Sequence, residues 1–193
     1  QYPILFTPEL ARGIVGSFLG AISGGSLYRQ ASFLLDSVGR QIFPEWLNIV
    51  EDPHIQRGFR SAYFDAEGVA TRKSPLVIDG KIARYILGSY SARKLGLSTT
   101  GNAGGIHNLS VTANSDDLQS LIKQMGTGLL VTELMGQGVN TLTGDYSRGA
   151  AGFWVENGEI QYAVDELTIA GNLANMLPAI EAIGADVDNR SHI

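Results

Sequence analysis

The sequence predicts an α+β fold in which a mainly antiparallel sheet, built from hairpins, packs against a few helices. Two turn motifs support this prediction, because Asp79-Gly80 and Asn157-Gly158 each supply the two positions of positive φ that a tight hairpin turn needs. Short apolar runs flank both turns, as expected for paired strands. Amphipathic helical segments lie between and around the hairpins, and this arrangement is typical of α+β proteins.

The first predicted helix spans about residues 8–22. Thr7-Pro8-Glu9 is typical of a helix start, because Thr can accept from free N–H groups, Pro suits the first turn and Glu faces the positive end of the dipole. An apolar face follows at a spacing of four residues: Leu10, Ile14, Phe18 and Ile22. Small residues form a second row on this helix: Gly13, Gly16, Gly20 and Gly24. Interior glycines disfavour a helix, so we expect close packing or a lost function there, and Gly24-Gly25 to end the helix.

The remaining elements are predicted from apolar periodicity and from capping residues. In chain order they are strands at 33–35, 47–50, 76–78 and 82–87, a helix opened by Asp116 and Asp117 and capped by Gly126, a strand at 129–135, the hairpin strands 153–155 and 160–164, and a helix from Asn172 to Gly184. Residues 186–193 are polar until a final Ile193, which resembles the entry to a strand that is missing. The chain begins with Gln, so we expect it to be a fragment of a longer protein.

Composition excludes several functional classes. The chain has 193 residues and a formal charge of −5, and no run of Lys or Arg could neutralise phosphates, so we expect no nucleic-acid partner. Its apolar runs are far shorter than the ~20 residues of a membrane span, so we expect no membrane partner and a soluble protein. The absence of cysteine excludes disulfides and zinc–thiolate sites, and it is compatible with a cytoplasmic location. Glycine is abundant, at 24 residues, which predicts many turns and close backbone contacts.

Motifs for nucleotides and metals are incomplete. The Gly144 to Gly149 stretch has the outer glycine spacing of a P-loop, but Ala150-Ala151 stand where Lys-Ser/Thr must follow. The three histidines, His54, His107 and His192, lie far apart in the sequence without a second histidine at helical spacing.

Two single residues remain candidates for a chemical role. His107 follows a glycine-rich loop that could place it at a cleft, although a lone histidine is more often an ordinary turn residue. Glu133 alternates with apolar residues of the strand 129–135, so we expect it to be buried and paired, with Arg148 as its partner. That ion pair is the structural reading, and a catalytic acid–base role is the alternative. Tyr146, Arg148, Phe153 and Trp154 have the composition of an interface, and core packing explains the last two equally well.

Four long stretches resemble the C-terminal domain of the TldD/PmbA metallopeptidase-associated family. They are the segments 89–96, 100–108 (TGNAGGIHN), 125–138 (MGTGLLVTELMGQG) and 143–158 (TGDYSRGAAGFWVENG), and segments 20–25 and 33–37 add to them. The resemblance covers nearly all of residues 1–193, which we expect to form a single domain with a strongly curved sheet. In the family an α/β domain precedes this region and a short strand follows it.

The resemblance implies a bacterial cytoplasmic pair of homologous subunits that proteolyse and mature peptides. In that family TldD carries zinc through a His-Glu-x-x-x-His helix. The matching positions here are Leu19, Gly20 and Gly24, which offer neither metal ligands nor a general base. We therefore expect no catalytic residue, no metal and no cofactor in this chain, with zinc in a TldD-like partner.

The resulting hypothesis is a non-zinc subunit of a TldD/PmbA-type metallopeptidase complex, with peptides as its substrates. One alternative is a stand-alone homodimeric peptide-binding or chaperone-like protein, and another is a hydrolase built around His107 and Glu133. We expect the Gly101 to His107 loop and the Gly136 to Gly149 segment to lie together and form the rim of a cleft. An extended peptide in this cleft would pair with the neighbouring strands by β-augmentation. These glycines could equally serve only as tight turns. The predicted peptide-binding residues are Gly104, Gly105, His107, Glu133, Gly136 and Arg148.

Overall fold

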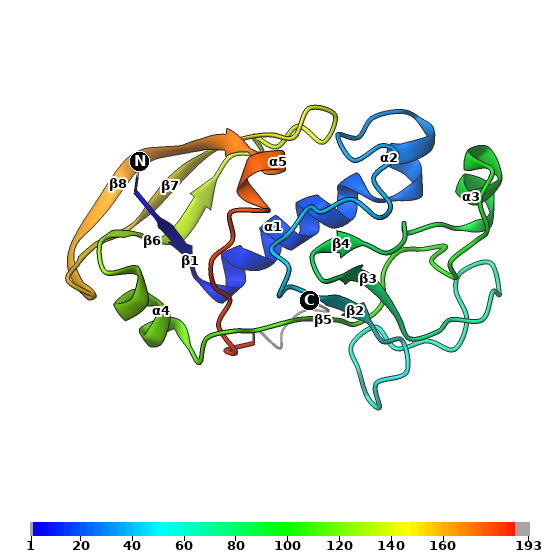
Figure 1. Ribbon diagram of the computed structural model, residues 1–193, viewed down its shortest axis with the longest axis horizontal. Coiled ribbons are helices and arrows are strands. Elements are labelled where there is room, and N and C mark those ends of the chain that lie inside the picture. Colours follow the sequence, from blue (N-terminus) through cyan, green and yellow to red (C-terminus); the bar gives the residue numbers. More distant parts are fainter. Residues whose placement is uncertain (1, 188–193) are drawn as a thin grey trace.

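Residues 2–187 are described by the computed structural model, which contains two four-stranded sheets (Figure 1). The first sheet has the order β1-β6-β7-β8 and comprises β1 (Ile4–Phe6), β6 (Gly128–Met135), β7 (Asp145–Glu156) and β8 (Glu159–Asn172). The second has the order β4-β3-β2-β5 and comprises β4 (Lys81–Ile82), β3 (Ser74–Ile78), β2 (Ile49–Glu51) and β5 (Leu109–Val111). Only the pairing of β1 with β6 is parallel, so the predicted α+β class with mainly antiparallel strands is confirmed.

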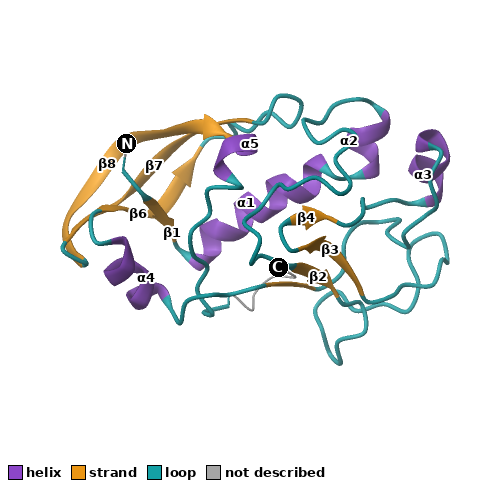
Figure 2. Ribbon diagram, viewed as in Figure 1, coloured by secondary structure: helices purple, strands orange, loops and turns teal. Residues whose placement is uncertain are grey.

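The predicted strong curvature is not seen, because neither sheet is strongly curled (Figure 1). The strands also divide between two sheets, so that neither sheet has to close around the core. Figure 2 shows that long loops surround the second sheet. The strand entry expected at residues 186–193 lies largely outside the described residues.

Five helices accompany the sheets within residues 2–187: α1 (Pro8–Ala21), α2 (Gly24–Tyr28), α3 (Ser89–Leu95), α4 (Leu118–Met125) and α5 (Leu173–Met176). Helix α1 passes between the two sheets in the view of Figure 1 and contributes to a core shared with both. Phe18 of α1 is fully buried, and its ring contacts that of Phe43 edge to face, with centroids 4.9 Å apart. None of the helices in this part of the chain is long and apolar enough to cross a membrane.

The predicted first helix is confirmed, with one difference at its end. Pro8 opens α1, and the chain leaves helical geometry after Ala21. Ser23 then starts a second short helix, because its hydroxyl accepts from the backbone N–H of Ser26, and Gly24 lies at the beginning of α2. The glycine row therefore crosses a break between two helices.

Both hairpin turns are confirmed. Asp79 and Gly80 have φ of 48° and 73°, and Asn157 and Gly158 have φ of 54° and 74°. The turn at Asn157-Gly158 joins β7 and β8, which are much longer than the predicted strands, whereas β4 is shorter. Asp117 caps α4 by accepting from the N–H of Ser120, and Gly126 follows its last residue with a positive φ, as expected.

Three further predicted elements are wrong, shortened or shifted. Residues 33–35 form a turn, because the backbone N–H of Phe33 pairs with the carbonyl of Thr141 in a loop and the hydroxyl of Ser32 accepts from the N–H of Leu34. The last helix begins after Asn172 as predicted but ends at Met176. Pro178 lacks the N–H that would continue the helix. The strand at 47–50 is found two residues later, as β2.

A β-bulge in β6 changes which side chains face the core. Val131 is paired with Gly152 and Glu133 with Ala151, so Thr132 is the extra residue. Beyond the bulge Leu134 faces the core, while Glu133 is exposed. The expectation that Glu133 is buried is therefore wrong.

Candidate functional site

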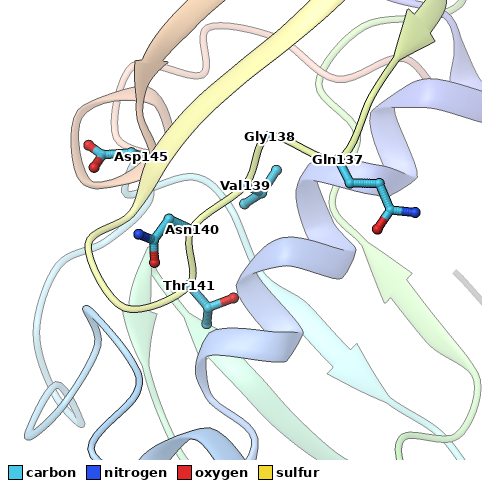
Figure 3. Close-up of a pocket in the computed structure, with 6 residues that line it drawn as sticks. All are labelled: Gln137, Gly138, Val139, Asn140, Thr141 and Asp145. Atoms are coloured by element: carbon cyan, nitrogen blue, oxygen red, sulfur yellow. The ribbon is translucent and has the colours of Figure 1, made fainter.

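A hollow lies where β6 connects to β7, and we refer to it as the β6–β7 hollow. Its larger part has a volume of about 450 Å³, and Figure 3 shows the residues that line it: Gln137, Gly138, Val139, Asn140, Thr141 and Asp145. A second part, of about 310 Å³, is lined by Gly136, Gln137, Val139 and Arg148. The two parts share Gln137 and Val139, so the connection itself forms the floor of the site.

The backbone of this connection has a free edge. Val139 pairs antiparallel with Tyr146, and the two bonds that flank the pair run from the N–H of Ser147 to the carbonyl of Gly138 (2.6 Å) and from the N–H of Asn140 to the carbonyl of Asp145 (2.8 Å). In this geometry the N–H and C=O of Val139 point away from β7. Neither group has a hydrogen-bond partner within the described residues. The hollow is therefore bordered by backbone groups that could pair with an extended chain.

Gly138 makes this close pairing possible. A Cβ at this position would lie 1.7 Å from the carbonyl oxygen of Ser147, which no side chain can tolerate. The glycine is required by the close approach of the two backbones. The sequence contains many glycines, so it does not single out Gly138.

Arg148 and Tyr146 lie on the core-facing side of β7. Tyr146 is 2% exposed, and its hydroxyl has no hydrogen-bond partner among the described residues; the same holds for the buried Nε of Arg148. Burial raises the pKa of Tyr146, and the charge of Arg148 partly opposes this shift. Both side chains thus present polar atoms that the described chain leaves unpaired.

Asp145 is fixed at the other end of the hollow. Its carboxylate accepts from the hydroxyl of Thr143 (2.6 Å) and from the side-chain amide of Asn172 (3.0 Å). These hydrogen bonds, that of Thr143 first, lower the pKa of Asp145. The Asp145 carboxylate thus stabilises the turn between β6 and β7 through these two hydrogen bonds.

His107 belongs to a different, buried polar network beside the second sheet. Glu51 of β2 is 2% exposed, and its Oε1 lies 2.7 Å from Nδ1 of His107 and 2.8 Å from the side-chain nitrogen of Asn102. Its other oxygen pairs with the guanidinium of Arg84. Burial lowers the pKa of Arg84, and the Glu51 carboxylate opposes that shift.

This network ties the Gly101 to His107 loop to β2. Arg84 also donates to the side-chain oxygens of Ser74 and Asn102, so every charged group has several partners, as buried charges require. The network accounts for the burial of His107, whose side chain is only 10% exposed. Glu51 was missed in the sequence, since the predicted strand ended at Val50.

Gly104 and Gly105 lie in the same loop, with φ of 93° and 114°. Side chains rarely adopt such conformations, so these glycines are explained by the turn that they form. A side chain at either position would strain the backbone.

The structure brings together only part of the predicted site. Gly136 and Arg148 share the β6–β7 hollow. The loop with Gly104, Gly105 and His107 lies beside the second sheet, and the two segments expected to form one rim stand apart, one beside each sheet (Figure 1). Glu133 forms no ion pair with Arg148 among the described residues, because the bulge turns it to the opposite face of the sheet. His107 thus belongs to the network at β2, whereas Glu133 lies on β6 of the first sheet.

The positions that match the zinc helix do not fit a metal. Leu19 is an apolar side chain 8% exposed, and Gly20 has no side chain. A Cβ on Gly24 would meet Oγ of Ser91 at 2.3 Å, so this position has no room for an imidazole. Gly24 also follows the break between α1 and α2. Residues 2–187 contain no cluster of three or more His, Cys, Asp or Glu side chains arranged to hold a metal.

Comparison with known proteins agrees with the motifs. The family model for the PmbA/TldA metallopeptidase C-terminal domain matches residues 1–193 of the sequence. The metalloprotease PmbA of Escherichia coli O157:H7 is 56% identical over 99% of this chain, and the chain spans 42% of that protein. The homologue from Haemophilus influenzae is 55% identical, with 43% of its length covered.

Solved structures have the same fold. The structure of TldE from Thermococcus kodakarensis matches 95% of the chain and 44% of its own, with a TM-score of 0.80 and 28% identity. A structure from Bacteroides thetaiotaomicron, described as a proposed modulator of DNA gyrase, matches 96% of the chain and 42% of its own, with a TM-score of 0.91 and 30% identity. The chain therefore belongs to the PmbA/TldA metallopeptidase family, whose C-terminal domain it contains.

Proposed function

We propose that this chain is the non-zinc subunit of a TldD/PmbA-type complex and supports the proteolysis and maturation of peptides in the bacterial cytoplasm. In this proposal a TldD-like homologous subunit carries zinc and hydrolyses the peptide. This chain holds part of the substrate and contributes the interface with its partner.

The observation that carries the proposal is the chemical character of Leu19, Gly20 and Gly24. Peptide hydrolysis by zinc needs nitrogen or oxygen ligands and a general base. Leucine and glycine supply none of these, and the contact of Gly24 with Ser91 uses the space that a ligand side chain would need. The chemistry is accordingly assigned to the partner.

The free edge at Val139 supports the peptide-holding role. An extended peptide beside it can accept from its N–H and donate to its C=O, and it would lie in the β6–β7 hollow. Such pairing recognises the peptide backbone more than the peptide sequence, which suits a complex that processes varied peptides.

Reconstitution tests the subunit role. We expect the full chain to cleave no unstructured peptide alone, and the mixture with a TldD-like subunit to cleave it faster than that subunit alone. Cleavage by this chain alone that survives chelators would support the hydrolase alternative. A stable homodimer that binds peptides and leaves TldD-dependent cleavage unchanged would support the stand-alone alternative. Either result would contradict the proposal.

A second experiment tests the edge at Val139. Val139→Pro removes the free N–H and keeps a side chain of three carbons, whereas the control Val139→Ala keeps the N–H and truncates the side chain. We expect the proline variant to bind peptide at least about tenfold more weakly, a loss typical of one hydrogen bond, while the alanine variant retains binding. Thermal unfolding of both variants confirms that the fold is intact. Equal binding by two folded variants would remove Val139 from the peptide site.

A further inference from the structure

Two buried side-chain atoms of the described residues have no hydrogen-bond partner, and they belong to neighbouring positions of β7. They are the hydroxyl of Tyr146 and Nε of Arg148. An unsatisfied polar atom in a protein interior is costly, and two of them on the same face of one strand call for an explanation.

Among the described residues, Arg148 is a cation without a counter-ion. No ion pair joins it to an acidic residue within residues 2–187, and no hydrogen bond of its guanidinium is found there. The acidic partner expected from the sequence, Glu133, lies on the other face of the sheet because of the bulge at Thr132. The side chain lines the β6–β7 hollow together with Gly136, Gln137 and Val139, so its unpaired donors border a space open to a ligand.

The chemistry of these donors selects a class of ligand. A guanidinium presents parallel N–H groups whose spacing matches the two oxygens of a carboxylate, and such charge-assisted pairs are stronger than neutral hydrogen bonds. Tyr146 lines neither part of the hollow and its hydroxyl is buried, so it is not one of these donors.

We propose that Arg148 binds a carboxylate of the peptide that lies in the β6–β7 hollow. The carboxylate is either the C-terminus of the peptide or an Asp or Glu side chain. This inference rests on the proposed peptide-holding function. Val139 lines the same part of the hollow as Arg148, so a peptide paired with Val139 would lie beside the guanidinium.

The test measures binding of three short peptides to the full chain by calorimetry: acetyl-Ala-Ala-Ala with a free C-terminus, the same peptide as its amide, and acetyl-Ala-Asp-Ala as its amide. We expect one or both acids to bind about 10- to 100-fold more tightly than the neutral amide, as a charged hydrogen-bond pair predicts. The free terminus identifies a terminal carboxylate, and the Asp peptide identifies a side-chain carboxylate.

Variants locate the effect. Arg148→Gln should abolish the preference for acids while binding of the neutral amide persists, and Arg148→Lys should keep only part of it, because an ammonium lacks the planar fork. Tyr146→Phe should leave the preference unchanged, because the buried hydroxyl lines neither part of the hollow. Arg93→Gln, on exposed α3, is the matched control and should change nothing.

The outcomes separate this inference from the function on which it rests. Equal binding of all three peptides to the wild-type chain would overturn the carboxylate site and leave the peptide-holding function standing. No binding of any peptide, alone or with a TldD-like subunit, would overturn both. A preference for acids that survives in a folded Arg148→Gln variant would place the carboxylate elsewhere.

Discussion

Oε1 of Glu51 accepts hydrogen bonds from both the backbone N–H and the ring Nδ1 of His107, at 2.8 and 2.7 Å. Because the same carboxylate oxygen accepts from both groups, Nδ1 is the donor in the second contact. This double contact fixes the loop that precedes β5 on the end of β2. The most conspicuous histidine of the sequence thus has a structural role in the second sheet.

Removal of the Glu51 carboxylate should destabilise the protein strongly. Glu51→Ala leaves the largely buried guanidinium of Arg84 without its counter-ion, and breaking such a buried pair costs about 3–5 kcal/mol. Urea denaturation measures the change in the free energy of unfolding. The control is Glu45→Ala, at an exposed position without an ion pair among the described residues. A loss below about 1 kcal/mol, the range of exposed pairs, would contradict the network.

Asp65 should contribute stability in a pH-dependent way. Burial raises its pKa, but hydrogen bonds from the backbone N–H groups of Ala103, Val69 and Glu67 outweigh burial, so the pKa lies below its ordinary value of 3.8. A carboxyl with a lowered pKa in the folded state stabilises the protein above its unfolded-state pKa. That contribution is lost as the pH falls through the folded-state value.

The variant Asp65→Asn tests this sign. An amide NH₂ would oppose the N–H of Ala103, so we expect a loss of about 1–3 kcal/mol near neutral pH. The difference between wild type and variant, measured by urea denaturation from pH 6 downward, should shrink below pH 3.8. A difference that grows as the pH falls would show that the shift has the opposite sign.

The glycine row should divide into two classes. A Cβ on Gly16 would meet nothing within 4 Å, so Gly16→Ala should stabilise the protein by about 0.5–1 kcal/mol through helix propensity. Gly24→Ala should instead cost about 1–3 kcal/mol, because its Cβ would clash with Ser91. Thermal unfolding of the two variants compares them directly, and the same sign for both would contradict the packing around Gly24.

Glu133→Ala should change the free energy of unfolding by less than about 0.5 kcal/mol, as is usual for an exposed residue, and Glu133 has no ion pair within residues 2–187. The sequence alone predicts a much larger loss, because simple alternation places Glu133 in the core. Chemical denaturation decides between the two, and a loss of several kcal/mol would mean that Thr132 is not the bulged residue.

Local signals predicted most of the fold. Asp79-Gly80 and Asn157-Gly158 fixed both hairpins, since their backbone conformations are rare for other residues. Asp117 and Gly126 marked the ends of α4, because the Asp117 side chain caps the first turn and Gly126 adopts a positive φ after the last residue. The division into two sheets and the parallel pairing of β1 depend on contacts between distant segments, and no local pattern carries them.

The candidate site was less predictable. Gly136 and Arg148 were identified, but the free edge of Val139 depends on its pairing with Tyr146, which the sequence does not show. A single extra residue, Thr132, reversed the face of Glu133 and with it the expected partner of Arg148. The Gly101 to His107 loop and the Gly136 to Gly149 segment are both rich in glycine. The sequence therefore does not show that they lie beside different sheets.

The zinc content of the purified full chain tests the central claim most directly. After incubation with excess zinc and gel filtration, elemental analysis should find far less than about one zinc per chain, because Leu19, Gly20 and Gly24 provide no ligands. A TldD-like subunit treated in the same way serves as the positive control. About one zinc per chain, retained through gel filtration as in a built site, would contradict the assignment of this chain as the non-zinc subunit.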